Sequence, residues 1–153
     1  AVPLYEQLEL LKKNKVAVVC GILSGTLASL TGIFVLCMLF GFNHQQYVTM
    51  LPKSITTAIG IGISEELGGI VTITVAVIII TGILGNVIAD TVFHIFKIKN
   101  PLAKGLALGT ASHAIGTARA IEMGPVEGAM SSLAVAVAGL LTVVFVSGFA
   151  QLI

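Results

Sequence analysis

The chain has 153 residues, of which 56% are hydrophobic and only 10% are charged, and its formal net charge is +1. This composition lies well outside that of soluble domains and is typical of an integral membrane protein. The only basic cluster is "KKNK" at residues 12–15, which is too small to predict binding to nucleic acid. The expected partner is the lipid bilayer.

Residues 1–15 do not form a signal peptide, because they lack a charged region followed by an apolar core. They are predicted to be the tail of an earlier helix. The uncharged run 16–42 exceeds the roughly 20 residues that a membrane-spanning helix needs. It contains both cysteines, Cys20 and Cys37, which lack the spacing of a metal site and are expected to be packing residues.

Two further uncharged runs, residues 70–89 and 128–153, predict a second and a third span. Both runs are rich in β-branched residues, but they show no alternation of apolar and polar positions. Runs of this length fit helices in lipid better than strands.

The lysines predict an orientation for these spans. They cluster at residues 12–15, before the first span, and at residues 97–104, after the second, whereas the connection between the two spans carries only Lys53. Because excess lysine and arginine stay on the cytoplasmic side, the first span is expected to run outward and the second inward.

Two short segments remain, residues 52–69 and 101–125. Both are apolar, interrupted by glycines, and end in acidic residues followed by Gly-Gly or Gly-Pro. Each glycine weakens a helix by about 1 kcal/mol relative to alanine, so "AIGIG" and "AIGTA" are the expected break points. We expect both segments to be re-entrant; the alternative is that each is an ordinary span that crosses once.

A shift of 56 positions aligns the two short segments, taking "AIG" at residues 58–60 onto residues 114–116, Ser54 onto Thr110, and Glu66 onto Glu122. This predicts a single domain, residues 1–153, with internal repeat units of about 43–93 and 99–153. Because the two units follow loops on opposite sides, the expected fold is an all-α membrane protein with three full transmembrane helices and two Gly-broken re-entrant segments that form an inverted-topology repeat.

Broken helices of this kind place free N–H groups near the bilayer midplane, where they suit an anion. Arg119 adds a cation that can grip a carboxylate through two parallel hydrogen bonds, or it extends to the cytoplasmic interface. A small carboxylate is therefore the expected substrate. The predicted substrate-binding residues are Thr110, Ser112, His113, Gly116, Thr117, Arg119, Ser54, Thr56, Thr57 and Gly60.

Four ionisable residues are candidates for ion coupling. His113 either couples protons or is a neutral packing residue hydrogen-bonded to a backbone carbonyl. Glu65, Glu66 and Glu122 pair with Arg119, bind a coupling cation, or lie at a solvated membrane edge. Catalysis is not expected, because Ser112 and His113 are adjacent and cannot face one another on a helix. No cofactor or metal is expected.

The stretch "NPLAKGLALGTASHAIGTARAIEMGPVEGAMSSLAVAVAGLLT", with "AVPLY" and "SITTAIGIGISEELGGI", closely resembles the LrgB/CidB family. The family's signature covers residues 109–116, Arg119, Glu122, Gly124, Glu127 and Gly128. The resemblance also implies an N-terminal membrane portion that would precede Ala1. It places the protein in a bacterial inner membrane as a multi-pass protein.

The resemblance implies two functions. The family is described as holin/antiholin-like modulators of murein hydrolase export and autolysis, and also as carriers of pyruvate, glycolate or glycerate. The predicted repeat favours a carrier that works by alternating access, with the holin/antiholin-like pore or regulator as the alternative. A homodimer and a small LrgA/CidA-like membrane partner are further expectations.

Overall fold

A computed structural model describes residues 7–153, which form seven helices and no strand. Residues 1–6, part of the predicted tail of an earlier helix, lie outside the described residues. The rest of that tail forms the short helix α2, Leu8–Lys13, which ends at Asn14, immediately before the first long helix.

Three helices are long and apolar enough to cross a membrane: α3 (Lys15–Leu39), α6 (Val71–Ile95) and α8 (Pro125–Ala150). They confirm the three predicted spans. Each presents large apolar side chains outward, for example Leu39, Val87 and Val144, which are 75%, 70% and 71% exposed. Such surfaces are costly in water and suit contact with lipid tails. The chain is therefore a helical membrane protein.

The first short segment, residues 52–69, contains α5 (Thr57–Glu66) and forms a helical hairpin with α4 (His44–Met50), which precedes it. The two helices run in opposite directions, since Gln45 at the start of α4 donates a hydrogen bond to the carbonyl of Gly68, just past the end of α5. The chain reverses at residues 51–56, before the "AIGIG" glycines, which lie inside α5. The expected break point was therefore wrong by several residues.

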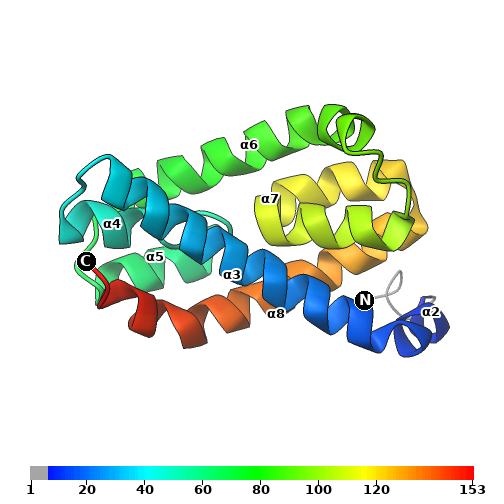
Figure 1. Cartoon of the computed structure of the whole chain (residues 1–153), viewed down its shortest axis with the longest axis horizontal. Coiled ribbons are helices and arrows are strands. Elements are labelled where there is room, and N and C mark those ends of the chain that lie inside the picture. Colours follow the sequence, from blue (N-terminus) through cyan, green and yellow to red (C-terminus); the bar gives the residue numbers. More distant parts are fainter. Residues whose placement is uncertain (1–6) are drawn as a thin grey trace.

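The second short segment, α7 (Pro101–Met123), is also folded back on itself. Its helical geometry is interrupted at His113, whose φ of 43° is in the left-handed region. The limbs on either side, residues 101–112 and 114–123, both pack on Ser131 of α8, through Gly109 and Thr117. Gly109 and Thr117 are eight positions apart, and both contact Ser131. This is possible only because the two limbs lie side by side (Figure 1).

The break again precedes the predicted glycine motif, so "AIGTA" lies within the second limb of α7. Gly116 has a packing role: a Cβ there would lie 2.8 Å from the carbonyl oxygen of Leu108 on the first limb. The glycine therefore permits close approach of the limbs, and the reversal itself falls on His113.

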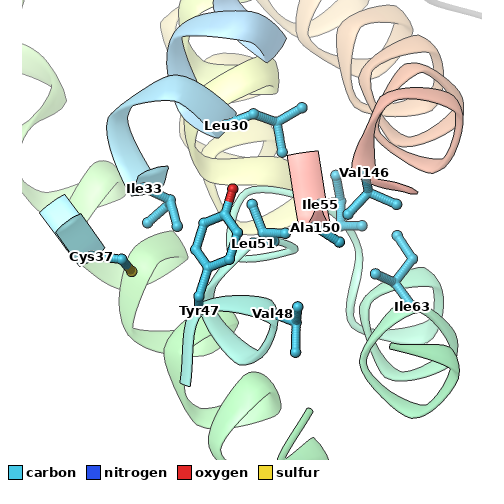
Figure 2. Close-up of a cluster of buried hydrophobic side chains, with 10 residues drawn as sticks. All are labelled: Leu30, Ile33, Cys37, Tyr47, Val48, Leu51, Ile55, Ile63, Val146 and Ala150. Atoms are coloured by element: carbon cyan, nitrogen blue, oxygen red, sulfur yellow. The ribbon is translucent and has the colours of Figure 1, made fainter. Parts of the chain in front are cut away.

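The two hairpins enter the bundle from opposite ends of α8 (Figure 1). At the C-terminal end, Tyr47 of α4 donates a hydrogen bond to the carbonyl of Phe149 at 2.9 Å. At the N-terminal end, Gly128 lies against Ile121 in the second limb of α7. A buried apolar cluster fixes the α4 end, with Tyr47 and Leu51 at its centre and Cys37 at its edge (Figure 2). Cys37 is thus a packing residue as predicted, whereas Cys20 is exposed.

Candidate functional site

A cavity of about 820 Å³, open on one side, lies between α3 and the first limb of α7. Small residues form most of its wall, among them Gly21 and Gly25 of α3. Its polar wall consists chiefly of hydroxyl groups, including those of Ser29, Ser54 and Thr110, with Lys53 as the one charged side chain.

Lys53 lies at the tip of the α4–α5 hairpin and reaches toward α3. Its Nζ donates hydrogen bonds to Ser54 Oγ at 2.7 Å and to Ser29 Oγ at 3.4 Å, and the two serine hydroxyls are 3.0 Å apart. A bound anion would favour the protonated form of the Lys53 side chain, because a nearby negative charge stabilises the ammonium.

A second, much smaller cavity of about 10 Å³ continues the first between the hairpin tips. That volume is close to the minimum that holds one water molecule. Thr26 of α3 lies on its wall, and Thr26 Oγ1 is the one buried side-chain N or O atom of residues 7–153 without a hydrogen-bond partner. A buried hydroxyl without a protein partner indicates that a solvent molecule or a ligand binds beside it.

Of the predicted substrate-binding residues, Ser54 and Thr110 are brought together on the walls of both cavities. Thr56 is the N-cap position of α5 and Thr57 is its first residue, so both lie at the start of a half-helix. Gly60 packs against the side chain of Ile78 in α6. None of these last three residues is on the wall of the large cavity.

His113 is buried at the break in α7, away from the large cavity. Its Nε2 lies 2.9 Å from the carbonyl oxygen of Ile78 and donates a hydrogen bond to it. Thr117 donates to the carbonyl of His113 at 2.9 Å and contacts Ser131 Oγ at 2.8 Å. Ser112 is buried against Gly85 of α6. These contacts hold the tip of α7 in place.

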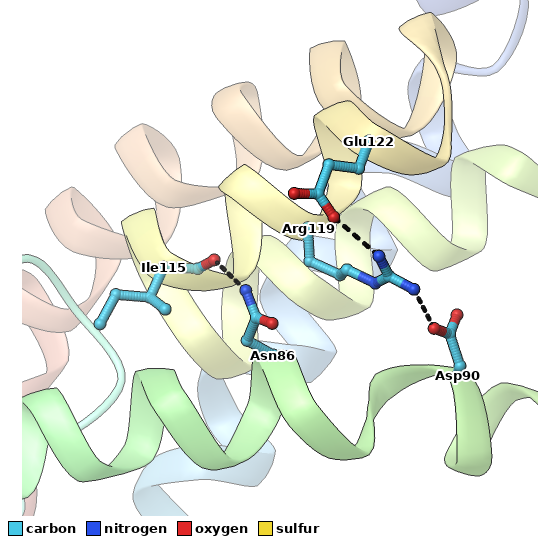
Figure 3. Close-up of polar contacts among 5 residues, drawn as sticks. All are labelled: Asn86, Asp90, Ile115, Arg119 and Glu122. Carbon is cyan, nitrogen blue, oxygen red and sulfur yellow. Dashed lines mark hydrogen bonds and ion pairs between the residues drawn. The ribbon is translucent and has the colours of Figure 1, made fainter.

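Arg119 lies on the second limb of α7, facing α6 (Figure 3). It forms ion pairs with Asp90 of α6 and, at 2.7 Å, with Glu122 on its own limb. Pairing with Arg119 was one of the alternatives predicted for Glu122. One turn earlier, Asn86 donates a hydrogen bond to the carbonyl of Ile115 at 3.1 Å. Arg119 is not on the wall of the large cavity. Glu65 and Glu66 are exposed at the end of α5.

The Arg119–Asp90 pair yields a stability prediction. Arg119→Ala and Asp90→Asn should each lower the thermal unfolding midpoint slightly and by similar amounts, because the pair is solvent-accessible. The double variant should be no less stable than either single variant, and the charge reversal Arg119→Asp with Asp90→Arg should restore part of the loss. Thermal unfolding of the purified variants in detergent measures all four; strictly additive losses would contradict the pairing.

Lys53 was missed as a site residue, because the sequence assigns residues 43–53 to an external loop. One signal was available: Lys53 is the only lysine outside the clusters at residues 12–15 and 97–104. The turn at residues 51–56 carries it inward to Ser29 of α3, and no local pattern of charge or hydropathy reports that long-range contact.

Fold and site together define a class: a helical membrane protein in which two hairpins meet beside a cavity whose wall carries a lysine and several hydroxyl groups. The model of the LrgB-like family matches residues 1–152. The chain belongs to the LrgB family.

Curated relatives agree with this assignment. The antiholin-like protein LrgB of Bacillus subtilis (strain 168) is 40% identical over 153 residues, which is 100% of this chain and 66% of that protein. The antiholin-like protein LrgB of Bacillus cereus (strain B4264) is 42% identical over 149 residues, covering 97% and 65%. This chain therefore spans just under two thirds of the length of these relatives. No solved structure matches it.

Proposed function

We propose that this chain is a carrier of small monocarboxylates, of the pyruvate, glycolate or glycerate class, in a bacterial inner membrane. The observation that carries the proposal is the meeting of two hairpin tips at the hydroxyl groups and the lysine of one cavity. Ser54 at the tip of the first hairpin and Thr110 near the tip of the second lie on the same wall. They are also the residues that the 56-position shift aligns.

In this proposal α4–α5 and α7 are re-entrant segments of an inverted-topology repeat. Support comes from their attachment to opposite ends of α8, through Tyr47 and through Ile121. In carriers of this type, the substrate lies between related broken helices, and movement of one repeat against the other exposes it to each side in turn. Irregular backbone at membrane depth is tolerated where it lines such a cavity.

The names of the relatives favour a second candidate function, an antiholin-like regulator of murein hydrolase export and autolysis. Both Bacillus proteins are named antiholin-like, so the comparisons support this function more directly than they support carriage. The two functions are compatible, because the movement of a metabolite can regulate lysis indirectly. A homodimer and a small LrgA/CidA-like membrane partner belong to the proposal as components of the complete assembly.

Uptake by proteoliposomes tests the carrier. Vesicles containing the protein should take up radiolabelled pyruvate, glycolate or glycerate with saturation, and unlabelled substrate should compete. An alternating-access carrier binds its substrate at one site, so the rate must reach a plateau. Protein-free vesicles give the background rate.

A pore predicts a different result in the same vesicles. Uncharged solutes of similar size, such as glycerol and urea, would then enter at comparable rates, and uptake would rise linearly with concentration. That outcome would replace carriage with the pore-forming alternative.

A further inference from the structure

Lys53 differs from every other basic residue in its place in the fold. The remaining lysines lie in α2, at the first residue of α3, or between the end of α6 and the first turns of α7, at one end of the bundle (Figure 1). Arg119 lies near that same end and is neutralised by Asp90 and Glu122. Lys53 alone is carried into the bundle, by the tip of the α4–α5 hairpin.

The depth of Lys53 follows from its contact with Ser29. At 1.5 Å per residue, Ser29 lies roughly 21 Å from the Lys15 end of α3 and roughly 15 Å from the Leu39 end. An ammonium group at this depth of a membrane is costly unless it has a counter-charge, and ionisable residues in such places mark substrate or ion pathways. The ion pairs of residues 7–153 all belong to Arg119, so Lys53 has no carboxylate partner among them.

We propose that Lys53 Nζ binds the carboxylate of the carried monocarboxylate, with the hydroxyls of Ser29 and Ser54 completing the subsite. The inference rests on the proposed carriage and identifies the cation for it. A lysine ammonium has three N–H donors. Two reach Ser29 and Ser54, which leaves one for a carboxylate oxygen at the cavity. Ser29 donates its hydroxyl hydrogen to Ser54 Oγ, so the Ser54 hydroxyl can turn its own hydrogen toward the second oxygen.

The rest of the cavity wall favours this class of ligand over others. The wall carries no carboxylate, so it offers no counter-charge to a cationic substrate. It carries one cation, which matches one carboxylate and disfavours a dicarboxylate, whose second charge would be desolvated without a partner. Thr110 Oγ1 already donates to the carbonyl of Leu106 at 2.9 Å, so it can accept a hydrogen bond from a hydroxyl group beside the carboxylate. Thr26 Oγ1 in the adjoining small cavity has no partner among the described residues and can also donate to a keto group.

Uptake and ligand-induced stabilisation by two lysine variants test the subsite. Lys53→Gln in the full-length protein should lower kcat/KM for pyruvate uptake by about 10- to 100-fold, the range for loss of a hydrogen bond to a charged group. Lys53→Arg, which keeps the charge, should retain more activity than Lys53→Gln. Lys99→Gln removes an exposed lysine outside the cavity and should behave like the wild type. Millimolar pyruvate should also raise the unfolding temperature of the wild type and of Lys99→Gln, and not of Lys53→Gln.

A cysteine variant distinguishes loss of the ammonium group from misfolding of the variant. In a background with Cys20→Ala and Cys37→Ala, Lys53→Cys should lose uptake and regain part of it after reaction with a methanethiosulfonate that adds an ethylammonium group. A reagent that adds a sulfonate should not restore it.

The outcomes separate the inference from the proposed function. Wild-type kcat/KM in Lys53→Gln, or equal stabilisation of Lys53→Gln and wild type by pyruvate, would overturn the subsite while leaving carriage intact. Lysine-dependent stabilisation by pyruvate without any saturable uptake would support the subsite and overturn carriage. Absence of both saturable uptake and stabilisation by any of the three monocarboxylates would overturn the two together.

Discussion

Replacing Gly109 by valine should destabilise the protein and abolish the proposed monocarboxylate uptake. A Cβ at position 109 would lie 2.5 Å from the carbonyl oxygen of Ser131 and 2.7 Å from Ala134 Cβ on α8. Backbone of a spanning helix cannot move aside as a flexible side chain can, so the first limb of α7 must separate from α8. Overpacking of this kind costs about 1–3 kcal/mol, and the larger end is expected here. Thermal unfolding in detergent measures the loss.

Gly148→Ala is the control, because Gly148 lies in α8, the helix on which Gly109 packs, and no atom lies within 4 Å of a Cβ built there. Alanine has the higher helix propensity, so this variant should be as stable as the wild type or more stable, by up to about 1 kcal/mol. If Gly109→Val and Gly148→Ala unfold at the same temperature, the close packing of α7 on α8 is not the structure of the protein in solution.

The sequence predicted those features of the fold that depend on composition along one segment. Three uncharged runs identified α3, α6 and α8, since a helix that crosses lipid must be apolar throughout. The two short segments were recognised because they interrupt that pattern. Both breaks were predicted at glycine motifs, and both lie before them. Helix propensity states how much a glycine destabilises a helix, but it does not show that Gly60 and Gly116 permit close packing inside one.

The candidate site was predictable only in part, because it depends on contacts between distant segments. Ser54 and Thr110 were selected by the shift that aligns the two segments, and they line one cavity. The ion pair of Arg119 with Asp90 joins residues 29 positions apart in different helices, so the sequence left Arg119 available for a substrate. Lys53 was assigned to a loop because charge counting reports the side of the membrane and carries no information about depth.

Chemical labelling of single cysteines should show that each hairpin begins and ends on one side of the membrane. In a background with Cys20→Ala and Cys37→Ala, Lys99→Cys before α7 and Glu122→Cys at its end should both react with a membrane-impermeant maleimide only from the cytoplasmic side. Gln45→Cys in α4 and Glu66→Cys at the end of α5 should react only from the outside. All four positions are exposed, so a lack of reaction reports membrane sidedness and not burial.

The pair Lys99→Cys and Glu122→Cys decides the topology, because the two residues are 23 positions apart. At 1.5 Å per residue, an unbroken helix of that length would be about 35 Å long, enough to cross a bilayer. Reaction of the two cysteines from opposite sides would therefore mean that α7 crosses once and α8 runs the other way. The two tips would then no longer approach from opposite leaflets, and the cavity at Lys53 would lose the symmetry on which alternating access depends.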